Sequence, residues 1–187
     1  KFAGIIYIFG EAGIGKSRLC WEFKESLERK GTKHFYLPCD QILKSSFNPF
    51  VYLLKNYFNI SNNNSNLENQ EKFEEIFKKL LEKTNYLPKV DKIQNTLNRI
   101  KPIFQGVLGL NQENTIYDDL DSKGRYENFC IALKELFKIE SILQPIVIEI
   151  DDSQWIDIDS KELLKKLTCN IQDFPIAILS IARYADD

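Results

Sequence analysis

The sequence contains no methionine, and it begins at Lys1, a few residues before its first apolar run. We therefore expect it to be a piece of a longer protein. It contains one histidine, His34, at the start of a short apolar stretch, and we expect a structural role for it. The cysteines form no C-x₂-C pair, which argues against a zinc site. We expect all four to be small buried hydrophobic residues: Cys20, Cys39, Cys130 and Cys169.

A long apolar run, a signal peptide and a strong net charge are also absent. No apolar segment is long enough to span a bilayer, so we expect no membrane contact. The net charge is −2, which gives the chain as a whole no attraction to nucleic acid or to an anionic membrane. Lysines near residues 78–83 alternate with glutamates, which is typical of a solvated helix face and predicts no direct contact with nucleic acid.

One motif near the start is informative. Residues 10–17 match G-x-x-x-x-G-K-[ST], the phosphate-binding loop. The apolar run 5–9 precedes it as a buried strand would, and a stretch with helical periodicity follows it. We expect the loop and the next residue to bind a nucleotide: Gly10, Glu11, Ala12, Gly13, Ile14, Gly15, Lys16, Ser17 and Arg18.

The residue types in this loop suit a polyphosphate and its cation. Gly10, Gly13 and Gly15 allow positive φ and a close approach of the backbone amides to an anion. The positive end of the following helix dipole adds to the attraction. Lys16 supplies a mobile charge for the β- and γ-phosphates, and the Ser17 hydroxyl is a ligand for Mg²⁺. We therefore predict ATP and Mg²⁺ as cofactors, and a cytoplasmic location with reduced thiols.

A second group of polar residues follows an apolar strand late in the chain. The strand 146–150 ends in Asp151 and Asp152. We expect Asp151 to hold Mg²⁺ together with Ser17, and Asp152 to orient or deprotonate the attacking water. Arg183 follows the final strand, from where a guanidinium can reach a γ-phosphate. We therefore expect Lys16, Asp152 and Arg183 to be catalytic. Glu149, inside the strand, is expected to form a structural ion pair or to face solvent.

The order of elements predicts an α/β fold. Strands are expected at 5–9, 34–37, 146–150 and 176–181, and helices at 17–29, 67–81, 90–99, 102–108 and 125–139, with a further helix opened by Pro49. Asp159 is expected to cap the helix that follows the acidic pair. This alternation predicts a three-layer α/β/α P-loop NTPase fold with a parallel sheet of four to five strands. Residues 1–187 would form the ATPase core, with a largely helical insertion at 41–124 between strands 2 and 3.

The same residues carry a family resemblance. The segments GEAGIGKSRL, IVIEIDDSQWID and ILSIAR resemble the AAA-like ATPase domain of STAND signalling proteins, and FNPFVYLLKNYF and RYENFCIALKELF are similar to segments between the nucleotide motifs. In that family the domain often accompanies adenylyl cyclase, protein kinase or LuxR-type regulator modules. The resemblance implies strand order 5-1-4-3-2, and a fifth strand and helical lid beyond Arg183. It also implies the roles given above for Lys16, Ser17, Asp151, Asp152 and Arg183. The family usually has an apolar residue where this chain has Glu149.

The function predicted from these features is an ATP-binding, slowly hydrolysing switch module. Its expected partners are other domains of the same longer chain, with self-association also possible. Two alternatives stay open: a non-hydrolysing nucleotide-binding scaffold, and a P-loop kinase that transfers phosphate to a small molecule. A GTPase is disfavoured, because the chain has neither an N-K-x-D motif nor a D-x-x-G sequence after the second strand.

Overall fold

The computed structural model describes residues 1–42, 45–110 and 117–184. The chain forms two compact units: Lys1–Leu53 with Glu140–Asp187, and Leu54–Ile139. Of the described residues, those of the first unit contain all four strands, and we call it the sheet unit. The described residues of the second form helices and turns, and we call it the helical unit.

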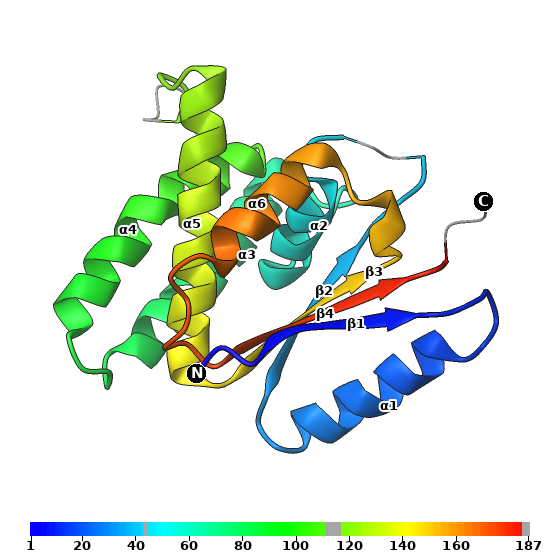
Figure 1. Ribbon diagram of the computed structural model, residues 1–187. Coiled ribbons are helices and arrows are strands. Elements are labelled where there is room, and N and C mark those ends of the chain that lie inside the picture. Colours follow the sequence, from blue (N-terminus) through cyan, green and yellow to red (C-terminus); the bar gives the residue numbers. More distant parts are fainter. Residues whose placement is uncertain (43–44, 111–116, 185–187) are drawn as a thin grey trace. The chain divides into compact units, whose positions relative to one another are not determined.

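The sheet is entirely parallel, with strand order β1-β4-β3-β2 (Figure 1). Its strands are β1 (Gly4–Phe9), β2 (Lys33–Pro38), β3 (Ile146–Asp151) and β4 (Ile176–Ala182). The order matches the 1-4-3-2 part of the expected arrangement. Because all strands run the same way, their carboxyl ends lie along one edge of the sheet. In register, Phe9 is beside Ala182, and Pro38 is beside Asp151. The loop after β1 and the acidic pair after β3 therefore share that edge.

Helices lie on both faces of the sheet. Cys20 of α1 (Lys16–Glu28) packs with Val147, Leu179 and Ile181 on one face. Alternate residues of the strands point to the other face, where α6 (Ile158–Thr168) lies (Figure 1). The three-layer α/β/α fold predicted from the sequence is therefore confirmed.

Strand β1 differs from the prediction of a buried strand. It is an edge strand of the described sheet, and Ile6, Tyr7 and Phe9 are 47%, 59% and 53% exposed. β3 and β4 are the buried strands, because each has a neighbouring strand on both sides. In helix α1, Cys20 and Leu27 face the sheet, whereas Leu19 is more than half exposed.

The helical unit contains α3 (Asn66–Thr84), α4 (Val90–Val107) and most of α5 (Ser122–Leu143); α2 (Asn48–Tyr57) begins in the sheet unit and ends in the helical one. Its core is aromatic: the ring centroid of Phe58 is 4.3 Å from that of Phe73 and 6.0 Å from that of Phe104. Ser65 and Glu68 form a capping box at the start of α3.

Helix α4 corrects the expectation of two helices over this stretch. Pro102 lies inside one continuous helix, Val90–Val107. A proline in a helix interior removes one hydrogen bond. Ile100, Ile103 and Phe104 are buried on both sides of it, so packing outweighs that loss.

Two smaller expectations are also corrected. The N-cap of α6 is Asp157, not Asp159, and its carboxylate accepts hydrogen bonds from the Ser160 backbone amide at 2.8 Å and hydroxyl at 2.7 Å. Cys169 is exposed, whereas Cys20, Cys39 and Cys130 are buried as expected. Residues 43–44 and 111–116 of the expected helical insertion, 41–124, lie outside the described residues. Among the helices of the described chain, none has the length and apolar character needed to cross a membrane.

Candidate nucleotide site

The loop between β1 and α1 has the backbone expected for an anion cradle. Gly13 and Gly15 have φ of 80° and 102°, values that favour glycine, and Gly15 directly precedes α1. Gly10 is not at positive φ, contrary to the sequence argument. A Cβ there would lie 3.0 Å from Ile14 Cγ2, a tight contact that the exposed Ile14 side chain can relieve by a small shift.

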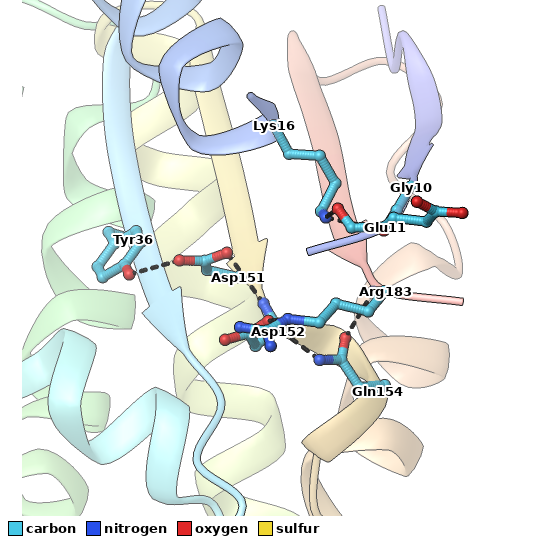
Figure 2. Close-up of polar contacts among 8 residues, drawn as sticks. All are labelled: Gly10, Glu11, Lys16, Tyr36, Asp151, Asp152, Gln154 and Arg183. Carbon is cyan, nitrogen blue, oxygen red and sulfur yellow. Dashed lines mark hydrogen bonds and ion pairs between the residues drawn. The ribbon is translucent and has the colours of Figure 1, made fainter. Parts of the chain in front are cut away.

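Lys16 folds back over this loop (Figure 2). Its ammonium Nζ donates to the carbonyl oxygens of Gly10 and Glu11, both at 2.8 Å. The charge is thus held above the glycine turn and next to the start of the helix, where backbone amides have no helical partner. Arg18 points elsewhere: its Nε donates to Glu22 at 2.8 Å, and its guanidinium lies 5.0 Å from the centre of the Trp21 ring.

Asp151 and Asp152 have distinct surroundings. Asp151 is the last residue of β3; its Oδ2 accepts from the Tyr36 hydroxyl at 2.9 Å and its Oδ1 from the Asp152 backbone amide at 3.0 Å (Figure 2). Asp152 has φ 50° and ψ 43°, a left-handed conformation that Asp tolerates better than most residues. The chain turns sharply there, so the two carboxylates point in different directions.

A polar network connects Asp152 to the end of β4 (Figure 2). The Gln154 amide donates to Asp152 Oδ1 at 3.0 Å, and its carbonyl oxygen accepts from the Arg183 backbone amide at 3.1 Å. Arg183 Nε lies 3.5 Å from Asp152 Oδ1. Ser180 of β4 donates to the hydroxyl of Ser153 at 2.9 Å. The structure thus brings Arg183 and Asp152 together.

The donors around the loop suit a hard cation that accompanies a phosphate. Ser17 is exposed, and Cys20 follows it by one turn on the same side of α1. Val147 of β3 packs against Cys20, and Asp151 follows Val147 by four residues on the same strand, so the Asp151 side chain lies on the sheet face that α1 covers. Each Asp151 oxygen retains a second lone pair. One hydroxyl and one carboxylate fit Mg²⁺, which keeps several waters and takes few protein ligands.

Glu149 is paired with His34 in the interior of the sheet unit, and a structural pair was one of its two predicted environments. Its Oε2 lies 2.6 Å from Nε2 of His34, and the two side chains are 9% and 6% exposed. The structural role expected for the single histidine has a clear basis in this pair. It ties β2 to β3 two residues before the carboxyl end of β3.

Two residues of the site were not found from the sequence. Tyr36 and Gln154 carry no motif, and they act through side chains that meet only when β2, β3 and β4 are assembled. The strand alternation of β2 was a usable signal for Tyr36, because it places His34 and Tyr36 on the same face.

Comparison with known proteins agrees with this geometry. No curated protein sequence matched the chain. A family model described as "AAA ATPase domain" matches residues 2–179, which include the loop and both aspartates. Arg183 lies just beyond the match. Since the match spans nearly the whole chain, the chain belongs to the AAA ATPase domain family and is a nucleotide-binding ATPase module.

Proposed function

We propose that this chain is a slowly hydrolysing regulatory module of a larger signalling protein, in which Mg-ATP binding acts as a conformational switch. The observation that carries the proposal is the link between Asp152 and the end of β4. Gln154 and Arg183 both contact Asp152 Oδ1, at 3.0 and 3.5 Å. Arg183, the proposed phosphate sensor, and Asp152, the proposed residue that orients the water, are thereby in direct contact.

The proposed roles follow from position. The loop amides and Lys16 would hold the phosphates, Ser17 and Asp151 would hold Mg²⁺, and Asp152 would orient the attacking water. Bound Mg²⁺ neutralises charge on the phosphate oxygens. Lys16 would exchange its two carbonyl acceptors for phosphate oxygens, which are stronger partners for an ammonium.

Arg183 supports the switch. Its side chain is 55% exposed, and its Nε approaches Asp152 only to 3.5 Å, which is a weak contact. A γ-phosphate carries more charge than one carboxylate and would draw the guanidinium away. Asp152 would then be released toward the water, and the chain after β4 would shift with Arg183. Other domains of the same cytoplasmic protein, or a second copy, would respond to that shift.

Nucleotide binding to the full chain tests the phosphate site. With a fluorescent ATP analogue, we expect Lys16→Ala to abolish binding, because the loop loses its only lysine. Lys30→Ala is the matched control; that lysine is exposed beyond the end of α1, and its loss should leave binding unchanged. Unchanged binding by Lys16→Ala would refute the proposal.

A measurement of ATP turnover distinguishes a hydrolysing switch from a non-hydrolysing scaffold and from a small-molecule kinase. Asp152→Asn keeps a residue type that tolerates the left-handed backbone and removes the basic carboxylate. We expect it to bind ATP but to release phosphate about 100-fold more slowly. Binding by the wild type without any phosphate release would indicate a scaffold, and release that depends on an added small-molecule acceptor would indicate a kinase.

A further inference from the structure

Tyr36 makes a contact that neither the family match nor any sequence motif assigns. It lies on β2 directly beside Glu149 in the register, yet its hydroxyl reaches along the strand to Asp151 and donates to Oδ2 at 2.9 Å (Figure 2). The other oxygen, Oδ1, accepts from the Asp152 amide. The carboxylate is therefore held by one donor on each oxygen, which fixes the plane of the carboxylate.

The Tyr36 side chain is itself held in place by a neighbouring ring, so it can orient the Asp151 carboxylate. Its ring packs edge-on against Tyr52 of α2, with centroids 6.4 Å apart and planes at 73°. A tyrosine hydroxyl is protonated at neutral pH, so it can donate to the Asp151 carboxylate.

Strand pairing alone does not account for this hydroxyl. The His34–Glu149 pair already connects β2 and β3 through side chains, and the backbone ladder continues to Pro38 and Asp151. Tyr36 is 38% exposed, so a phenylalanine would fill the same volume equally well. What only the tyrosine adds is a donor aimed at one oxygen of Asp151.

We propose that Tyr36 is a positioning residue for the metal-binding carboxylate: it fixes Asp151 so that the remaining lone pairs face the cation of bound Mg-nucleotide. The proposal rests on the function proposed above. Partners that orient a metal-binding carboxylate typically change metal affinity by about 10- to 100-fold. The Tyr36 hydroxyl is neutral, and Asp151 also accepts from the Asp152 amide, so we expect an effect at the lower end of this range, about a tenfold loss of Mg²⁺ affinity.

The test separates nucleotide binding from its Mg²⁺ dependence. In the full chain, a fluorescent ATP analogue is first titrated in EDTA and then with increasing free Mg²⁺. We expect Tyr36→Phe to match the wild type in EDTA, because the loop is intact, and to need about tenfold more Mg²⁺ for the same enhancement. Mn²⁺ bound with the same analogue, measured by electron paramagnetic resonance, should show the same loss without any turnover.

Tyr52→Phe is the matched control, since it removes a hydroxyl from the ring that packs on Tyr36 and should leave the Mg²⁺ requirement unchanged. An unchanged Mg²⁺ requirement in Tyr36→Phe refutes the positioning role while the proposed function stands. An equal loss of affinity for the ATP analogue in EDTA and in Mg²⁺ also refutes the positioning role, because the tyrosine hydroxyl would then be structural. A wild type that binds no analogue under either condition refutes the proposed function and the positioning role together.

Discussion

The buried pair between His34 and Glu149 gives the sharpest test of how the sheet is held together. His34→Phe removes the imidazole and leaves the Glu149 carboxylate, which is 9% exposed, without its partner at 2.6 Å. Removing one member of a buried ion pair costs about 3–5 kcal/mol, because the other charge stays desolvated. That is a large part of the roughly 5–15 kcal/mol that stabilises a typical domain. With a urea m-value of about 2 kcal/mol/M, the unfolding midpoint should fall by about 1.5–2.5 M.

The chain offers a selective reporter for this measurement. Its two tryptophans, Trp21 and Trp155, both lie in the sheet unit, so tryptophan fluorescence follows urea unfolding of that unit. Glu25→Gln is the control; it breaks an exposed pair with Arg29 on α1 and should change the free energy of unfolding by no more than about 0.5 kcal/mol.

A double variant decides whether the pair or the packing matters. His34→Phe with Glu149→Leu replaces both polar groups by apolar ones, and we expect it to unfold within about 1 kcal/mol of the wild type. The double variant should therefore be more stable than His34→Phe alone. A loss of unfolding free energy below about 1 kcal/mol in His34→Phe would show that this reasoning about desolvation is wrong. So would a double variant whose loss equals the sum of the losses in His34→Phe alone and Glu149→Leu alone.

Three further predictions concern other parts of the chain. Phe73→Ala empties the centre of the aromatic core and should destabilise the helical unit by about 3–5 kcal/mol, measured by circular dichroism during urea unfolding; a loss below about 1 kcal/mol would mean that the core closes around the gap. Asp157→Ala removes the cap that the Ser160 amide requires and should cost the sheet unit about 1 kcal/mol, with no loss expected for Asp159→Ala. Iodoacetamide at pH 8 should alkylate exposed Cys169 well before Cys39, since burial raises the pKa of the Cys39 thiol to about 12; mass spectrometry of brief reactions would expose the opposite order.

The sequence predicted the features that depend on local spacing. The glycines and Lys16 follow a strand and precede a helix, and the acidic pair ends an apolar run, so their positions could be read from a single chain. Strands and helices alternate along the chain, and this local pattern also predicted the parallel sheet. A structural ion pair was one of the two environments expected for Glu149, the other being a solvent-facing position, because a carboxylate within an apolar strand requires either a partner or water.

Features that depend on assembly were missed. The exposure of β1 follows from its place at the edge of the sheet, which its own residues do not encode. Pro102 continues a helix because tertiary packing outweighs one lost hydrogen bond. The Tyr36–Asp151 contact joins two strands across 115 positions of the sequence, and Gln154 meets the Arg183 amide 29 positions further on, so no local spacing rule predicts either contact.

The strand order has a consequence for synthesis on the ribosome. β1 pairs with β4 alone among the described strands, and β4 is the last of them to be made. At 5–20 residues per second, roughly 10–30 s pass between the emergence of these two neighbours. Throughout that interval the apolar first strand and the loop after it have no sheet to join. A chaperone or transient contacts within the nascent chain must cover these apolar residues until β4 inserts between β1 and β3.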